Sequence, residues 1–434
     1  MSLDIRPLIA AEHLAERLPG EMARGLEGSQ ILAIAAHVKR CIAAGQRVAN
    51  LTIGDFDPQN FPIPDVLHDG IIAALAARQT SYPPAVGMPE LRSAIRSFYA
   101  ARLGLNYPEG SVQVGSGARP PIYAAFRTVL DPGDLVVYPV PTWNIRYYVY
   151  LMGARGAAVR ARAENGFMPT AADLLPHLGE ARVVVLNSPL NPAGTVIAPE
   201  LLREICEAIV DENERRITKG ERPVVLLYDQ VYWQLTFDGH AHHSPVSLVP
   251  KMAPYTVHID AISKCWAATG VRVGWAVGPP QLIGRMKPLV GHMGAWAARA
   301  EQLATAHLLA EPTRVDPFMS SFSGQIRSRL QRLAAGMRAL ADDGMPVEVI
   351  DPQGAIYLSI RFDLFGRTVA GRRIETDEDL RIALLEEAGV AVVPFTAFGM
   401  ESGTGWIRTS VGTVTEDDID GAIERLRALI PKIR

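Results

Sequence analysis

The sequence is poor in cysteine. Its 434 residues contain only Cys41, Cys206 and Cys265, an odd and scattered set that matches neither a disulfide framework nor the spacing of paired metal ligands. Such a pattern is typical of proteins in a reducing compartment. We therefore expect a cytoplasmic protein.

The chain also lacks an excess of positive charge and any long apolar run. Lys and Arg total 43 and Asp and Glu total 46, a formal net charge of −3, so no basic field is available to hold a nucleic-acid backbone. No apolar run reaches the roughly 18 residues of a membrane span. Residues 1–20 mix acidic residues into their apolar stretch, unlike a secretory signal. These absences argue against the nucleic-acid-binding, membrane-spanning and secreted classes.

What is present is an ordinary globular composition, 48% hydrophobic and 21% charged, in a chain long enough for two packed domains. Short β-branched runs alternate with segments of helical period. The runs are Val112–Val114, Leu135–Tyr138, Val183–Leu186 and Val224–Tyr228, and the helical segments include Pro121–Leu130 and Leu201–Asn213. This alternation predicts an α/β fold with a mostly parallel sheet covered by helices on both faces.

The two ends of the chain are expected to form a smaller α/β domain. Helix and strand patterns recur there at Gln30–Gln46, Val48–Ile53, Ala355–Ile360 and Val390–Val393. We predict an N-terminal arm and part of the small domain over residues 1–60, a large domain over 61–310, and the rest of the small domain over 311–434. In parallel sheets the ligand site gathers at the carboxyl ends of the strands, so functional side chains should follow each run.

A single lysine, Lys264, stands in the apolar, small-residue segment Ser263–Gly274. Desolvation lowers the pKa of an amine and makes it nucleophilic, as imine formation with an aldehyde cofactor requires. Arg272, later in the same segment, could grip a phosphate with its planar guanidinium. The segment alone fits equally well a surface lysine followed by a glycine-rich turn.

Other polar residues after predicted strands suit a cofactor with a pyridine ring. Asp229 ends a buried-looking strand, and a carboxylate beside a pyridine nitrogen keeps that nitrogen protonated, so that the ring accepts electrons. Tyr232 and Asn191 can both donate hydrogen bonds to a phenolate oxygen on the ring. The alternatives are a turn cap for Asp229 and a plain proline-rich turn around Asn191.

Two stretches could bind anions. Ser116–Ala118 lies between a strand and a helix start, where unpaired amides can seat a phosphate. Pro120 stands where a dinucleotide-binding fingerprint has its third glycine, which disfavours a nicotinamide site. Arg408, inside a strand-like run, suits a substrate carboxylate, and a structural ion pair is the alternative.

For three other features we favour a structural interpretation over a functional one. His240, His242 and His243 share one loop without the carboxylates and cysteines that usually complete a metal site, so no metal is expected. Cys265 is expected to pack rather than to act as a nucleophile. Trp143 could stack on a flat ring, although a buried tryptophan often belongs only to the core.

Together these stretches resemble, in order along the chain, the fold-type I pyridoxal-phosphate enzymes of the class I and II aminotransferases, the group that includes aspartate and aromatic aminotransferases. The resemblance runs from about Gly28 to the C-terminus. It implies that Lys264 is the Schiff-base and proton-transferring lysine, with Asp229 at the pyridine nitrogen and Tyr232 at the ring oxygen. The other implied cofactor contacts are Ser116, Gly117, Ala118, Trp143, Asn191, Ser263, Arg272 and, from the neighbouring subunit of a homodimer, Tyr82. The implied substrate contacts are Gly54, Asn191 and Arg408.

Two positions depart from the family pattern. Ala261 stands where many members have a phosphate-binding serine, and Phe395 follows Pro394 where a glycine is usual. These departures predict a phosphate grip that differs in detail.

Arg119 is the most informative position for the substrate. In a bacterial subgroup resembling aspartate aminotransferases, the matching position holds a lysine that binds the distal carboxylate of acidic substrates. We hypothesise that Arg119 does likewise, with aspartate or glutamate as amino donor, a 2-oxo acid such as 2-oxoglutarate as acceptor, and ping-pong kinetics. The alternative is that Arg119 pairs with a nearby acid. A β-lyase of the same fold stays open, as does, less strongly, a non-catalytic cofactor-binding sensor.

Overall fold

The computed structural model describes residues 4–9 and 17–434 of the chain. Residues 1–3 and 10–16, part of the stretch predicted not to be a secretory signal, lie outside the described residues. No helix in the described part of the chain has both the length and the apolarity that crossing a membrane requires.

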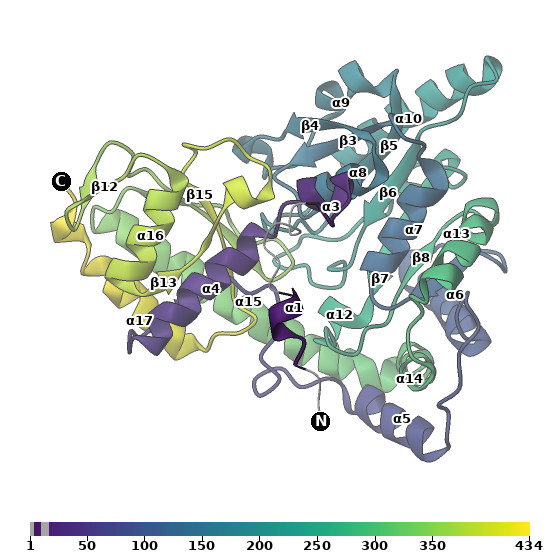
Figure 1. Cartoon of the computed structure of the whole chain (residues 1–434), viewed down its shortest axis with the longest axis horizontal. Helices are drawn as coiled ribbons and strands as arrows, with labels where there is room; N and C mark the ends of the chain where they lie inside the picture. The colour runs from purple at the N-terminus through teal and green to yellow at the C-terminus, as the bar shows by residue number, and fades with distance from the viewer. Residues whose placement is uncertain (1–3, 10–16) are drawn as a thin grey trace.

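A seven-stranded sheet forms the larger half of the molecule (Figure 1), with strand order β2-β8-β7-β6-β5-β3-β4. Its strands are β2 (Val112–Gly115), β3 (Leu135–Val140), β4 (Arg155–Arg160), β5 (Ala181–Asn187), β6 (Val225–Asp229), β7 (Thr256–Ala261) and β8 (Gly274–Val277). The pairs from β4 to β7 are parallel, and β8 runs antiparallel to both of its neighbours. The mostly parallel sheet predicted from the alternation of runs is confirmed.

Helices cover both faces of this sheet, because its strands are apolar on both sides. One core cluster joins the sheet to α7 (Arg119–Val129), α8 (Ile145–Met152), α9 (Ala171–Leu178), α10 (Pro199–Thr218) and α13 (Pro280–Met293). The other cluster extends from the opposite face through α6 (Pro89–Leu103), α14 (Arg299–Ala310) and α15 (Pro312–Asp342) to the C-terminal helices. The remaining helical elements here are α5 (Asp65–Ala76), α11 (Pro245–Leu248), α12 (Ile262–Cys265), η1 (Ala163–Asn165) and η2 (Pro250–Met252).

The smaller half contains a four-stranded antiparallel sheet in the order β14-β15-β10-β9. Its strands are β9 (Val347–Val349), β10 (Tyr357–Phe362), β14 (Val393–Pro394) and β15 (Trp406–Ser410), and two short pairs accompany it, β1 (Ala49–Asn50) with β13 (Val390–Ala391) and β11 (Thr368–Val369) with β12 (Arg372–Arg373). The helical elements are α4 (Gln30–Ala43), α16 (Asp377–Ala388), α17 (Glu416–Arg427), η3 (Phe395–Phe398) and η4 (Ile430–Lys432). Of the N-terminal helices α1 (Arg6–Ile9) and α3 (Glu21–Gly25), α3 lies against α8 of the larger half, where Tyr150 donates a hydrogen bond to the carbonyl of Met22 (3.0 Å). Figure 1 shows the long helix α15 running between the two halves.

The predicted runs became strands, with two partial failures. The run Val390–Val393 is divided between the two-residue strands β13 and β14, which belong to different sheets. The run Val48–Ile53 yields only the two residues of β1, because the chain then turns into the segment that carries Gly54. The predicted helix Gln30–Gln46 ends at Ala43. The domain boundaries at residues 60 and 310 stay a prediction.

The return from α10 to β6 shows how the sheet edge is positioned. The side chain of Asn213, fully buried in α10, accepts a hydrogen bond from the backbone N of Val224 (2.7 Å) and donates one to its carbonyl (2.9 Å). Both polar groups of that backbone are thereby satisfied as the chain enters the core. Strand β6 therefore starts in a fixed position and delivers Asp229 at its far end.

Candidate active site

The carboxyl ends of β2, β5, β6 and β7 meet at one cavity of about 450 Å³. Its walls come from both halves of the molecule, as expected for a ligand site at the strand ends of an α/β sheet. The predicted site residues that line it are Gly54, Ala118, Arg119, Trp143, Asn191, Asp229, Tyr232, Ser263, Lys264, Arg272 and Arg408.

Lys264 projects into this cavity from the short helix α12, which directly follows β7. Its amine donates a hydrogen bond to the carbonyl of Gly54 (2.5 Å) and lies 5.9 Å from the centre of the Tyr232 ring. Withdrawal from solvent lowers the pKa of Lys264 to about 8, Asp55 opposes that shift, and Arg408, Arg272 and Arg119 add to it. A surface lysine is therefore ruled out, and part of this amine is unprotonated near neutral pH.

Asp229 lies at the last position of β6, in the wall of the same cavity. Burial raises the pKa of its carboxyl to about 6, while the amide of Val231 (3.2 Å) and the charge of Lys264 lower it. Asp229 thus caps the following turn, as the alternative interpretation predicted, and its other side-chain oxygen has no recorded hydrogen bond among the described residues. The two interpretations are compatible.

Arg408, on β15, is 2% exposed and lines the cavity. Its guanidinium donates hydrogen bonds to the Asn191 side-chain oxygen (3.1 Å) and to the carbonyl of Thr52, and it stacks on the rings of Tyr357 (4.7 Å) and Phe398 (4.9 Å). Among the described residues no carboxylate pairs with it, and its Nε has no partner. The structure therefore does not show the alternative, a structural ion pair. It leaves Arg408 as a buried cation without an anion, which is energetically costly.

The phosphate seat predicted at Ser116–Ala118 differs in its donors. The amides of Ser116 and Gly117 are already bonded to the carbonyls of Ala295 and Gly115. The next two helix residues, Pro120 and Pro121, carry no N–H. The amides of Ala118 and Arg119, at the start of α7, have no recorded acceptor among the described residues, so the phosphate site at Ser116–Ala118 stays a prediction and would combine these two amides with side chains that bind the phosphate.

The side chain best placed to do so is Arg272. It donates to the carbonyls of Thr269 (2.7 Å) and Ser116 (3.1 Å), beside Gly117. A Cβ on Gly117 would collide with the Arg272 guanidinium, and a Cβ on Gly274 would collide with the backbone of Gly117. Glycine at both positions lets Arg272 and the end of β2 come together at one point.

Arg119, the first residue of α7, is exposed and lies with its guanidinium 4.7 Å from the ring centre of Trp143. None of the ion pairs among the described residues includes it. Its charge contributes to the lowered pKa of both Lys264 and Arg272. The alternative of a neighbouring acid is thus not what the described residues show.

Three predicted features lie away from the cavity. Tyr82 is 84% exposed and packs edge-on against Trp296 (5.7 Å). Phe395 is fully buried among aromatic rings, so its departure from glycine serves the core. His242 is half-buried near Tyr228, and desolvation lowers its pKa to about 3. No group of three potential metal ligands occurs among the described residues.

The sequence interpretation missed Tyr357 and Asp55. The hydroxyl of Tyr357, on β10, lies 2.6 Å from the hydroxyl of Tyr232. The carboxylate of Asp55, next to Gly54, accepts a hydrogen bond from Thr269 (2.5 Å). The signal that identified Asp229, an acid at the end of an apolar run, was also present at Asp55.

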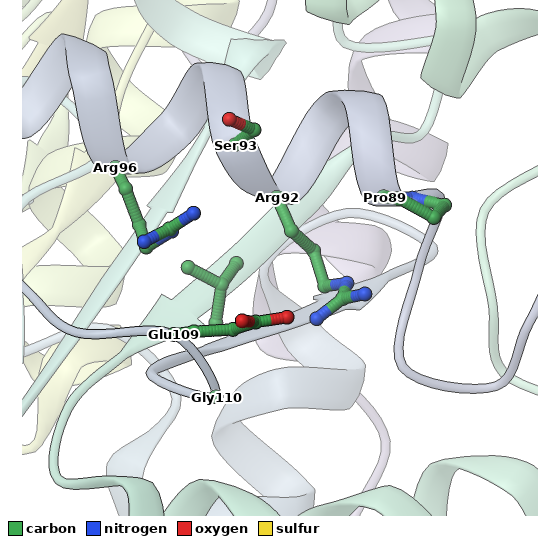
Figure 2. A pocket seen from close by; sticks show the side chains of 7 residues that line it. Pro89, Arg92, Ser93, Arg96, Glu109 and Gly110 are labelled. Atoms are coloured by element: carbon green, nitrogen blue, oxygen red, sulfur yellow. The ribbon is translucent and has the colours of Figure 1, made fainter.

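A second hollow, of about 220 Å³, lies between α6 and the turn that precedes β2. Figure 2 shows Arg92 and Arg96 extending from α6 toward Glu109. It shares no lining residue with the active-site cavity.

The fold and this cavity define an α/β enzyme with a half-buried lysine and acid at the strand ends. The family model for "Aminotransferase class I and II" matches residues 46–426. The aspartate aminotransferase of Rhizobium meliloti (strain 1021) is 30% identical over 96% of this chain and 97% of its own length, and the probable aspartate/prephenate aminotransferase of Rhizobium leguminosarum bv. phaseoli is 30% identical over 92% and 95%.

Solved structures agree. The aspartate aminotransferase from Rhizobium meliloti superposes with a TM-score of 0.87 at 28% identity, covering 96% of this chain and 99% of the other. That from Thermus thermophilus with maleate gives 0.83 at 26% identity, covering 95% and 99%. The chain belongs to the class I and II aminotransferases. It is an aminotransferase that depends on pyridoxal phosphate.

The residues present fit this cofactor. The cavity offers an amine of lowered pKa at Lys264, a buried acid at Asp229, and the Arg272 guanidinium at a close glycine contact. An amine, an acid and a phosphate-binding cation are the partners that the aldehyde, the pyridine nitrogen and the phosphate need.

Proposed function

We propose that this aminotransferase acts on dicarboxylic substrates, with aspartate or glutamate as donor and a 2-oxo acid such as 2-oxoglutarate as acceptor. The observation that carries the proposal is a pair of arginines, Arg408 and Arg119, that line the cavity of Lys264 without an acidic partner among the described residues. A substrate with two carboxylates would satisfy both cations.

In the proposed binding mode, Arg408 holds the substrate α-carboxylate. It is buried and oriented by Asn191 and Thr52, so its free edge can approach a carboxylate in one direction only. Because the Asn191 oxygen faces Arg408, its amide nitrogen remains to donate to the cofactor ring oxygen. The carbonyl of Gly54 accepts from the Lys264 amine, and its missing side chain leaves room for the Tyr357 hydroxyl.

Proton transfer is proposed for Lys264. Bound pyridoxal phosphate supplies the aldehyde that links to amines and a ring that accepts electrons. Once the substrate amine has replaced it, Lys264 Nζ takes the proton from the substrate Cα, and a pKa of about 8 suits both its uptake and its return. Asp229 keeps the ring nitrogen protonated, and Tyr232 donates to the ring oxygen.

Holding of the cofactor phosphate is proposed for Arg272, with Ser263 and the Ser116–Ala118 turn beside it. Ser263 lines the cavity next to Lys264, and Arg272 reaches Ser116. Trp143 would lie against the ring, since its flat side chain also lines the cavity.

A homodimer with shared sites is also proposed. Tyr82 extends into solvent with 84% of its surface exposed, and Ile72 and Leu75 nearby in sequence are 55% and 50% exposed. Exposed apolar residues of this size are common where a second subunit packs. Light scattering that gave the mass of a single chain at working concentration would contradict this part.

The substrate proposal is tested with Arg119→Ala. Loss of one charge-assisted contact should lower kcat/KM for aspartate and glutamate by roughly tenfold to a hundredfold, and leave alanine and an aromatic amino acid nearly unchanged. Arg119→Lys is the matched control and should retain most dicarboxylate activity. An equal loss for all donors would remove the dicarboxylate assignment. The same donor screen without a keto acid would reveal a lyase by release of ammonia.

A further inference from the structure

Tyr357 and Tyr232 share a single short contact inside the active site. Their hydroxyl oxygens lie 2.6 Å apart, and the two side chains are 1% and 3% exposed. Their rings meet edge-on, with centroids 5.6 Å apart. Each phenol has one hydrogen to donate, so in this pair only one of them is the donor.

The direction of this hydrogen bond follows from what Tyr232 must do. If Tyr232 donates its hydrogen to the cofactor ring oxygen, as the proposed function requires, it can only accept from Tyr357. No other hydrogen-bond partner of the Tyr357 hydroxyl is recorded among the described residues. The hydrogen of Tyr357 is therefore available for Tyr232.

Tyr357 also contacts the substrate side of the site. The Arg408 guanidinium lies 4.7 Å from the centre of its ring. A Cβ on Gly54 would stand 2.5 Å from its hydroxyl, so the glycine provides the room for this phenol. One side chain thus lies between the arginine for the α-carboxylate and the tyrosine for the ring oxygen.

We propose that Tyr357 is a positioning residue that donates a hydrogen bond to Tyr232 and transmits to it whether the charge of Arg408 is offset by a bound carboxylate. The inference deepens the proposed function and rests on it. A hydrogen bond received by Tyr232 polarises its own O–H and makes it a stronger donor. A cation over the Tyr357 ring strengthens the first donor in this chain.

The charged and titratable groups that face the two phenols come from three elements and one loop. They are Arg408 on β15, Asp229 on β6, Asp55 beside Gly54, and Lys264 on α12. Burial raises the pKa of both tyrosines, and Arg408 opposes this rise. Both phenols therefore stay protonated and act as hydrogen donors at working pH.

The measurable consequence is the pH at which the proton on the Lys264 linkage to the cofactor is lost, seen as a change in visible absorption. A donor to the ring oxygen stabilises negative charge there most when the linkage carries no proton, so it lowers this midpoint. Tyr357→Phe should raise the midpoint by about 0.1–0.7 pH unit, the effect of weakening a charged hydrogen bond by roughly 10–30%. Tyr232→Phe, which removes the bond itself, should raise it further.

A double-mutant cycle tests the route. In the Tyr232→Phe background there is no phenol left to polarise, so adding Tyr357→Phe should leave the midpoint unchanged. Tyr228→Phe is the matched control, because it removes a fully buried phenol that donates to the carbonyl of His243 (2.9 Å) outside the cavity. It should fold and titrate like the wild-type protein.

A carboxylate tests the link to Arg408. Maleate, an unreactive dicarboxylate, should raise the midpoint in the wild-type protein by offsetting the charge of Arg408, and raise it less in Tyr357→Phe. The inference would be overturned if maleate raised the midpoint equally in the wild-type protein and in Tyr357→Phe, or if Tyr357→Phe left the midpoint unchanged. It would also be overturned if Tyr357→Phe shifted the midpoint by the same amount in the wild-type and Tyr232→Phe backgrounds. Wild-type protein without a chromophore, or Tyr232→Phe with an unchanged midpoint, would instead overturn the proposed function.

Discussion

The inner and outer walls of the active-site cavity hold their charged side chains in different ways. On the inner wall, the Lys264, Asp229 and Arg408 side chains each bond a backbone group, at Gly54, Val231 and Thr52 respectively. On the outer wall, Arg119 and Arg272 are exposed, although Arg272 also bonds the backbone carbonyls of Thr269 and Ser116. Among the described residues, the one recorded contact of the Arg119 side chain is the face of Trp143.

This difference separates two tasks. Groups that move protons or fix the reacting carbon need one geometry, and burial with backbone hydrogen bonds supplies it. A group that selects the far end of a substrate needs only to be within reach of it. Because such a group is exposed, its substitution costs little folding stability. Substitutions on the inner wall should therefore change the reaction itself, whereas substitution of Arg119 should change the choice of substrate and substitution of Arg272 should weaken cofactor binding.

The largest effect is expected at Lys264. Lys264→Ala removes both the linkage to the cofactor and the proton carrier, so kcat should fall by at least about 10²–10⁴-fold for every substrate. Borohydride reduction followed by mass spectrometry of peptides should find a trapped adduct at this residue in the wild-type protein and none in the variant. An adduct at another lysine, with activity retained, would erase the distinction between the walls.

Part of this division could be predicted from the sequence. Lys264 and Asp229 carry local signals, a polar residue inside or just after an apolar run, and parallel strands bring such positions together. Arg408 was also recognisable as a lone cation in a strand pattern. The mostly parallel sheet followed from the same runs.

Long-range contacts could not be predicted. Tyr357 lies 125 residues from Tyr232, and a run such as Ala355–Ile360 does not reveal which of its side chains faces the cavity. The amide of Ser116 is occupied by a carbonyl at Ala295, which no local pattern indicates. Folding brings such partners together through packing of distant elements, and one sequence carries no direct signal of that packing.

A pH effect on stability is expected from Asp260, a fully buried acid on β7 behind the inner wall. It accepts hydrogen bonds from Ala261 N (2.8 Å), Trp233 Nε1 (2.9 Å) and Tyr99 (3.3 Å), yet burial raises its pKa to about 8. The folded state thus binds this proton more tightly than the unfolded state. The stabilisation is complete below about pH 4 and is lost as the pH rises through about 8, by up to several kcal/mol.

Urea denaturation of the wild-type protein and Asp260→Asn at pH 5 and pH 8 measures this contribution. The free energy of unfolding of the wild-type protein, relative to that of the variant, should be smaller at pH 8. The variant has a constant cost, since its amide nitrogen faces a donor. His242 and His258, whose pKa values burial lowers to about 3, affect both proteins alike. If the free energies of unfolding of the two proteins differed by the same amount at both pH values, the three hydrogen-bond donors would outweigh the effect of burial on the pKa of Asp260.

The smallest effect is expected from Ala261→Ser at the end of β7. Ala261 lines the cavity next to Ser263, at the position where the family pattern has a phosphate-binding serine. A new hydroxyl there should bond the cofactor phosphate and lower the dissociation constant of pyridoxal phosphate by up to about tenfold, the value of one net hydrogen bond. The gain is limited because residue 261 is fully buried, so the hydroxyl is left without water when the cofactor is absent. Titration of the cofactor into both proteins, with Ser263→Ala as a control expected to bind more weakly, measures the effect. If Ser263→Ala weakens binding while Ala261→Ser leaves it unchanged, the phosphate depends on Arg272 and Ser263, and a side chain at residue 261 does not reach it.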